Sequence, residues 1–168
     1  MATWSSDKLT GGVSSSAYEA QSPAAEKSIK AWDNLTNTQW LQFKTEAGKD
    51  SVGPPYWWKY DFGEGVSWKV GAYKLCTAND AVGRDPKTWT LQISNTGAFS
   101  GEEVTIDTVE NGGLSDSRQT WSGIFVCDSP PASAYRYVRI YITNLKVDTY
   151  SSTNNSCQVA EFEMYIDE

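Results

Sequence analysis

Short apolar stretches recur throughout the chain, and clusters of turn-forming residues such as Asn95-Thr96-Gly97 and Asn111-Gly112-Gly113 separate them. Within the stretch 137–142 an aliphatic residue occupies every second position, which is typical of a strand with one buried face. No segment shows the 3.6-residue period of a long amphipathic helix. Many short strands without such helices predict an all-β sandwich or jelly roll and argue against a parallel α/β sheet.

A chain of 168 residues has an ordinary size for one domain, so we expect a single domain over 1–168. Residues 1–23 are rich in Ser, Ala, Gly and Thr and show neither the period of two of a strand nor the period of 3.6 of a helix. We therefore expect an irregular segment there and a β-sandwich body over 24–168. The stretch 24–31 permits about two helical turns. The expected strands cover 56–62, 66–75, 89–93, 104–106, 123–126, 137–142 and 160–166.

Acidic residues outnumber basic ones, with 21 Asp and Glu against 14 Lys and Arg and a formal net charge of -7. This sign opposes binding to a phosphate backbone, so we expect no nucleic-acid partner. No apolar run reaches the roughly 18 residues of a transmembrane helix. The first residues also lack the cationic-then-apolar pattern of a signal peptide.

Cys76, Cys127 and Cys157 are an odd number of cysteines at wide spacing, which fits neither a disulfide framework nor paired zinc ligands. At most one bridge can form within the chain, and the spacing favours small buried free thiols instead. Together with the missing signal pattern, this favours an intracellular chain or a piece of a secreted one.

The chain contains no histidine, the commonest proton-transferring side chain in enzymes. This excludes Ser-His-Asp and Cys-His machinery and most catalytic zinc sites. Carboxylate pairs remain as a means of glycoside hydrolysis, and the adjacent candidates are Asp80 with Asp85 and Glu102 with Glu103. Acidic residues in such loops more commonly serve solvation and turn formation. The segment 63–65 lacks the third glycine of a dinucleotide-binding loop, and we expect a non-catalytic protein.

Five segments in order carry family-like motifs. The segments 31–40, 55–63 and 79–91 read A-W-D-N-L-T-N-T-Q-W, P-Y-W-W-K-Y-D-F-G and N-D-A-V-G-R-D-P-K-T-W-T-L, and strand-like runs follow at 135–140 and 159–165. Together they resemble discoidin-like domains, also called F5/8 type C or galactose-binding-like, which include many bacterial carbohydrate-binding modules. The resemblance implies a discoidin-like jelly-roll β-sandwich.

The resemblance also implies a structural cation site, in which the loop after residue 30 meets the last strand around calcium or sodium. The implied ligands are the Asp33 and Glu161 carboxylates, the Thr38 hydroxyl and carbonyl, and the carbonyls of Lys30, Leu35 and Ala160. A ligand set of two carboxylates and several neutral carbonyls suits a hard cation that takes six to eight oxygen ligands. The alternative is that Asp33 caps a turn and Glu161 is a surface residue.

A sugar site is implied by the same resemblance, because similar members hold saccharide hydroxyls with the loop after the third strand. Here that loop supplies Asn79, Asp80, Arg84 and Asp85. The alternative is that Arg84 and Asp85 pair to brace the loop ahead of Pro86. Galactose binders of this kind often use a histidine, which this chain lacks.

The aromatic partner of such a sugar site has to come from the eight tryptophans and nine tyrosines, which serve both as core residues and as stacking platforms. Strand patterns assign a first set mainly to the core: Trp40, Trp58, Tyr60, Phe62, Trp68 and Trp89. A second set lies nearer to turns: Tyr56, Trp57, Trp121 and Tyr150. We expect Trp121 or Tyr56 to form the platform.

These observations favour a non-catalytic, lectin-like carbohydrate-binding module with a structural calcium site, whose partner is a glycan or oligosaccharide. The alternatives are a protein-interaction module of a larger intracellular assembly and a cell-surface adhesion domain. Phospholipid binding is disfavoured, because anionic leaflets attract clusters of Lys and Arg and this chain is acidic. The family favours an extracellular location within a secreted parent protein.

Overall fold

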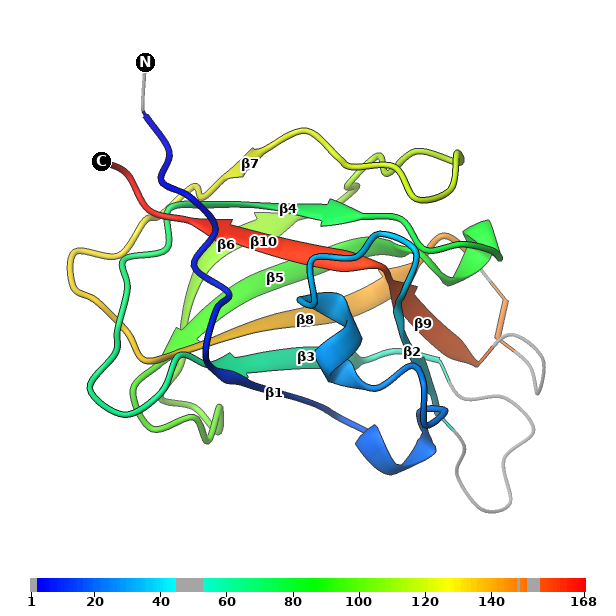
Figure 1. Cartoon of the computed structure of the whole chain (residues 1–168), viewed down its shortest axis with the longest axis horizontal. Coiled ribbons are helices and arrows are strands. Elements are labelled where there is room, and N and C mark those ends of the chain that lie inside the picture. Colours follow the sequence, from blue (N-terminus) through cyan, green and yellow to red (C-terminus); the bar gives the residue numbers. More distant parts are fainter. Residues whose placement is uncertain (1–2, 45–52, 148, 151–154) are drawn as a thin grey trace.

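The structure is a computed structural model and describes residues 3–44, 53–147, 149–150 and 155–168. Among these residues the regular elements are antiparallel strands and short 3-10 helices (Figure 1). The five-stranded sheet has the order β1 (Val13–Ser16), β3 (Tyr56–Asp61), β8 (Tyr137–Leu145), β5 (Pro86–Ser94) and β6 (Val104–Val109). The smaller sheets are β10 (Glu161–Tyr165), β4 (Ala72–Cys76) and β7 (Phe125–Val126), and β2 (Trp40–Phe43) with β9 (Ser156–Val159). The predicted all-β class is confirmed.

The core lies between the five-stranded and three-stranded sheets. In β3 the side chains of Tyr56, Trp58 and Tyr60 are fully buried, whereas the intervening residues are half-buried, as the period of two predicts. The ring of Trp58 lies 4.7 Å from that of Phe162 on β10, centroid to centroid, and so joins the two layers. The Trp58 indole N–H also donates to the Ser28 carbonyl at 2.9 Å, which satisfies its polar atom inside the core.

The predicted irregular segment over 1–23 is wrong for Val13–Ser16, which form β1 and pair with β3. This strand has the sequence VSSS, and its only aliphatic residue, Val13, is 69% exposed. Because no apolar alternation marks β1, its strand conformation comes from backbone pairing with β3. The structure also replaces the two helical turns permitted at 24–31 with one 3-10 turn, η2 (Ser28–Ala31).

Strands β2 and β9 were not expected either, and the two pair with each other. Each carries a fully buried glutamine, Gln42 in β2 and Gln158 in β9, where the period-two pattern calls for an apolar side chain. The expected strand over 66–75 begins only at Ala72, and the residues before it form a loop. Trp68 lies in that loop and is half-buried.

The two ends of the sandwich differ. Both chain termini lie at one end, where Ser5 donates a backbone hydrogen bond to the Ile166 carbonyl at 3.0 Å (Figure 1). The short helix η3 (Val82–Arg84), which belongs to the loop expected to hold saccharide hydroxyls, lies at the opposite end (Figure 1). The described residues contain no helix long and apolar enough to cross a membrane.

Candidate functional site

The first part of the candidate site is the segment 30–38, called here the cation loop. The Asp33 carboxylate organises it, because it accepts hydrogen bonds from the Leu35 backbone N–H at 3.1 Å and from the Thr38 hydroxyl at 2.8 Å. Lys30 places its ammonium 3.0 Å from the other oxygen of Asp33. The fold thus brings four of the predicted ligand residues into one loop.

Glu161, at the start of β10, reaches the same loop. Its side chain is 2% exposed, and its carboxylate accepts a hydrogen bond from the Leu35 N–H at 3.4 Å. Burial and the adjacent Asp33 raise the pKa of Glu161 to about 8. Burial acts against ionisation of Asp33 as well, but hydrogen bonds from Lys30 and Thr38 bring the pKa of Asp33 below its ordinary value. Ala160, which precedes Glu161, is fully buried and its N–H donates to the Cys76 carbonyl at 3.0 Å.

This donor set fits a hard cation. It offers two carboxylates, one hydroxyl and the carbonyls of the loop, which are oxygen ligands of the kind that calcium and sodium take. Two adjacent carboxylates, one of them buried, repel one another when both are ionised, and a cation between them would remove that repulsion. The donors are all oxygens, without the imidazole or thiolate ligands that zinc and copper prefer.

The second part is the segment 79–85, called here the hydroxyl loop. Its Asp85 is fully buried and forms a bidentate ion pair with Arg118, at 2.9 and 2.7 Å, and a longer contact with Lys146 at 3.4 Å. The expectation that Asp85 contacts a ligand is therefore wrong, because solvent does not reach it. The alternative that Arg84 braces Asp85 is also wrong, since Arg84 lies 3.6 Å from Asp80.

Hydrogen bonds from Gln158 and Arg118 to backbone carbonyls also hold the hydroxyl loop in place. The Gln158 amide of β9 donates to the carbonyls of Asp80 and Ala81, at 3.0 and 3.2 Å. Arg118 donates to the Asp80 carbonyl as well, at 3.0 Å. The side chains of Asn79 and Asp80 remain exposed, and Arg84 is half-buried. These three residues are the members of the predicted sugar-binding set that the loop leaves open to solvent.

The expected aromatic platforms lie elsewhere. Tyr56 is fully buried as the first inward residue of β3, so the prediction of a stacking role for Tyr56 is wrong. Trp121 is half-buried beside Cys76 at the end of β4, and the Lys74 ammonium lies 4.1 Å from the centroid of its ring. Lys74 also pairs with Glu163 at 2.9 Å, which fixes it over the indole.

A polar depression of about 240 Å³ lies between the cation loop and the hydroxyl loop. Its lining consists of Ala25, Glu26, Asn37, Thr38, Gln39 and Asn79. Gln39 organises the depression, because its amide donates to the Glu26 carboxylate at 2.9 Å and its carbonyl oxygen accepts from the Asn79 N–H at 3.2 Å. The depression thus unites one predicted sugar-binding residue, Asn79, with one predicted cation ligand, Thr38.

Glu26, Asn37 and Gln39 were missed as site residues. Asn37 and Gln39 stand within the 31–40 motif, which the resemblance connects only with the cation site. Glu26 had no signal, because its place is set by the backbone hydrogen bond from Leu41 to its carbonyl at 3.0 Å. The lining offers a carboxylate acceptor and amides that both donate and accept, but no aromatic ring.

Three of the four carboxylates considered for hydrolysis, Asp85, Glu102 and Glu103, make structural contacts, whereas Asp80 is exposed. Asp85 is buried in its ion pair with Arg118. Glu102 holds the turn after β5, since its carboxylate accepts from Ser94 and Thr96 at 2.6 Å each, and these bonds lower the pKa of Glu102. Glu103 accepts from the Gly101 N–H at 2.8 Å. Turn formation, the simpler of the two interpretations, matches these contacts.

No family model matches the chain, and no curated protein matches it either. Solved structures do match, and three of them match over nearly the whole of both chains. Chitosan-binding module 1 from the chitosanase/glucanase of Paenibacillus sp. IK-5 is 19% identical over 95% of this chain and 98% of that one, with a TM-score of 0.66. The family 32 carbohydrate-binding module of C. perfringens NanJ, in complex with galactose, is 14% identical, with coverages of 98% and 100% and a TM-score of 0.66.

A third match is the F5/8 type C domain of a Bacteroides fragilis protein, which is 15% identical over 98% of this chain and 97% of that one, with a TM-score of 0.71. Identities this low establish the fold alone. The predicted discoidin-like β-sandwich is thereby confirmed, and the chain shares it with F5/8 type C domains and family 32 carbohydrate-binding modules.

Proposed function

We propose that the chain is a non-catalytic carbohydrate-binding module and that the polar depression between the cation loop and the hydroxyl loop is its saccharide site. One observation carries this proposal: Thr38, from the predicted cation site, and Asn79, from the predicted sugar site, line the same depression. Solved structures with the same fold include modules described as chitosan-binding and as a complex with galactose, which supports a saccharide ligand.

The chemistry of the depression supports vicinal hydroxyls as the groups bound. The half-buried Glu26 carboxylate would accept from one hydroxyl, and the exposed amides of Asn37 and Asn79 would donate to or accept from its neighbour. Gln39 acts as a positioning residue, because its amide ties Glu26 to Asn79 and so holds the distance between acceptor and donor. Asp80 and Arg84, exposed or half-exposed beside the depression, would supply further contacts to a longer ligand.

We further propose a structural calcium ion, with sodium as the alternative, held by the carboxylates of Asp33 and Glu161, by Thr38, and by the carbonyls of Lys30, Leu35 and Ala160. Support comes from the paired carboxylates, of which Glu161 is 2% exposed, and from the oxygen-only donor set. Such an ion would tie the cation loop to β10 and would hold Thr38 at the edge of the saccharide site. The ion would thus act on the ligand through the shape of the depression.

Binding of the purified chain to a glycan array and to immobilised polysaccharides, with calcium or with chelator, tests both proposals. The informative variant is Glu26→Ala/Asn79→Ala, and the matched control is Glu110→Ala/Asn111→Ala, which removes the same residue types at two exposed positions after β6. We expect the first variant to lose binding and the control to keep it. Equal binding by the two variants would place the saccharide site elsewhere, and binding to no glycan would overturn the proposed function.

A further inference from the structure

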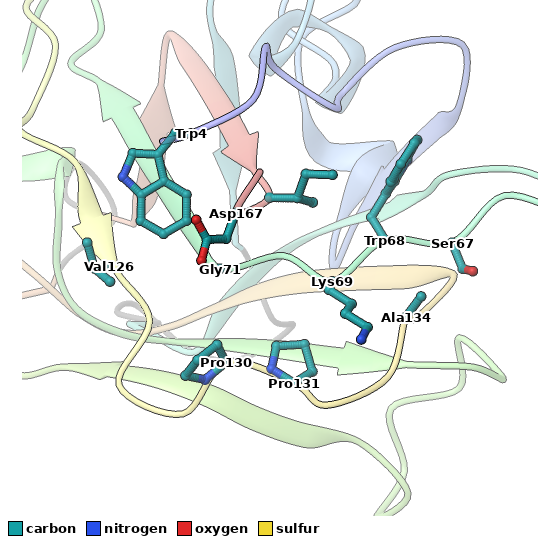
Figure 2. Close-up of a pocket in the computed structure, with 11 residues that line it drawn as sticks. Trp4, Ser67, Trp68, Lys69, Gly71, Val126, Pro130, Pro131, Ala134 and Asp167 are labelled. Atoms are coloured by element: carbon teal, nitrogen blue, oxygen red, sulfur yellow. The ribbon is translucent and has the colours of Figure 1, made fainter. Parts of the chain in front are cut away.

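A second, mostly apolar cavity lies at the end of the sandwich that carries the termini, opposite the hydroxyl loop. Its volume is about 840 Å³, and its lining includes two indoles, Trp4 and Trp68, and the rings of Pro130 and Pro131 (Figure 2). A concave site of this size, mostly apolar with a few polar groups, is the usual form of a small-molecule site. Neither the sequence motifs nor the function proposed above accounts for it.

Backbone pairing holds both indoles in place. Trp4 forms a β-bridge with Asp167, and on either side of it Glu168 donates to the Thr3 carbonyl and Ser5 to the Ile166 carbonyl, each at 3.0 Å. Trp68 exchanges two backbone hydrogen bonds of 3.0 Å with Tyr135, and the Lys8 ammonium lies 4.9 Å from the centroid of its ring. The walls are therefore formed before any ligand arrives, which reduces the entropy lost on binding.

Three polar groups lie among the apolar walls: the Asp167 carboxylate, the Lys69 ammonium and the Ser67 hydroxyl. In the view of Figure 2 the side chain of Asp167 lies next to Trp4, and that of Lys69 lies near Pro131 and Ala134. Among the described residues, none forms a side-chain hydrogen bond or ion pair with these three groups. The cavity thus presents a free acceptor, a free donor and a hydroxyl beside flat apolar rings.

We propose that this cavity is a second saccharide site, which takes a neutral oligosaccharide. The C–H faces of the sugar rings would pack on Trp68 and Trp4, and the hydroxyls would bond to Asp167, Lys69 and Ser67. A polyproline segment would pack on the indoles, and its carbonyls would accept from Lys69 and Ser67, but it has no N–H to donate to Asp167. Each sugar hydroxyl both donates and accepts, so a saccharide can satisfy all three polar groups. Among the lining residues one carboxylate and one ammonium balance in charge, so the lining itself selects neither an anion nor a cation.

The second site lies at the opposite end of the sandwich from the hydroxyl loop (Figure 1). One short oligosaccharide would therefore not contact both saccharide sites. They would instead engage two chains, or two distant parts of one chain. The module would then cross-link polysaccharide, with the gain in avidity that two sites provide.

The direct test follows the indole N–H signals of the full chain by NMR, with Trp4→Phe and Trp68→Phe used to assign them. Cellotetraose and tetra-N-acetylchitotetraose are titrated as probes, and a decaproline peptide serves as the rival ligand. We expect a tetrasaccharide to shift the Trp4 and Trp68 signals, and to do so equally in the Glu26→Ala/Asn79→Ala variant. The proposal would be overturned if only decaproline shifted these signals, or if none of the three probes shifted them.

Affinity measurements on variants provide the second readout. Trp68→Ala should weaken binding at this site at least about tenfold, and Asp167→Asn or Lys69→Ala, which change exposed side chains and preserve the fold, about three- to tenfold. The matched control is Trp57→Ala, a half-buried tryptophan on the outer face of β3. If Asp167→Asn and Lys69→Ala bind like wild type while Glu26→Ala/Asn79→Ala loses all binding, this second site is refuted and the function proposed above stands.

Discussion

Asp85 and Arg118 form a bidentate ion pair that joins the hydroxyl loop to the segment before β7, with O–N distances of 2.9 and 2.7 Å. Asp85 is fully buried, and the side chain of Arg118 is 20% exposed. The pair raises the pKa of Arg118 above its ordinary value, because the hydrogen bond to Asp85 favours the charged guanidinium. Asp85, which the sequence motif associates with ligand contact, therefore stabilises the conformation of the loop.

Arg118→Ala should lower the free energy of unfolding by about 3 kcal/mol, because it leaves the buried Asp85 carboxylate with the longer contact to Lys146 as its remaining ion pair. Chemical denaturation measures the change. The control is Asp80→Ala, which removes an exposed carboxylate 3.6 Å from Arg84 and should cost less than about 1 kcal/mol. Equal costs for the two variants would contradict the structural role of Asp85.

In chelator, the melting temperature should fall as the pH rises from about 4.5 towards 8. The pKa of Glu161 is raised from 4.5 to about 8 in the folded state, so over this range the folded chain binds more protons than the unfolded chain and loses stability as the pH rises. Glu161→Gln should flatten this slope, whereas Glu110→Gln, at an exposed position, should not. An unchanged slope in Glu161→Gln would show that other groups cause it.

Calcium should raise the melting temperature most at the upper end of that pH range, because it binds the ionised carboxylates and competes with their protons. Glu161→Gln and Asp33→Asn should each abolish most of the calcium response. The response is followed by thermal unfolding, and bound metal by native mass spectrometry. A melting curve that calcium leaves unchanged at pH 8, together with no bound metal, would refute the cation site.

Asn79→Ala should weaken saccharide binding about three- to tenfold through the loss of one hydrogen bond, and Gln39→Ala should do the same by releasing Glu26 and Asn79 from their common bridge. Isothermal titration with the best ligand from the glycan array measures both. Trp121→Ala should have little effect, because Trp121 does not line the depression. A loss of affinity in Trp121→Ala larger than in Asn79→Ala would restore the stacking role that the sequence predicted for Trp121.

Neighbouring tryptophans of β3 provide a matched test of the core. Trp58→Ala should cost about 3 to 5 kcal/mol of unfolding free energy, because Trp58 is fully buried and joins β3 to β10 through Phe162. Trp57→Ala, one residue earlier and on the outer face of the same strand, should cost clearly less. Denaturant midpoints of the two variants give the comparison, and similar midpoints would contradict the assigned register of β3.

The alternation of side chains predicted the strands that bury one apolar face, among them β3, β5 and β8, because a period of two is a local property of the chain. The sequence motif also named Asp33, Leu35 and Thr38, which meet within one short loop. The strand pattern is confirmed because it depends on neighbouring positions of the chain. The contacts of Asp33 with Leu35 and Thr38 are equally local, and the role of these residues as cation ligands stays a prediction.

Tertiary contacts decided the remainder. Strand β1 exists because β3 pairs with it, and β2 and β9 pair with each other while burying glutamines that no hydrophobic pattern predicts. Asp85 finds its partner in Arg118, 33 positions away, and not in the adjacent Arg84. Trp4 and Trp68, assigned to an irregular segment and to the core, meet at a cavity because backbone bridges to Asp167 and Tyr135 carry them there. Pairing over such distances depends on how the sheets close, which no local period encodes.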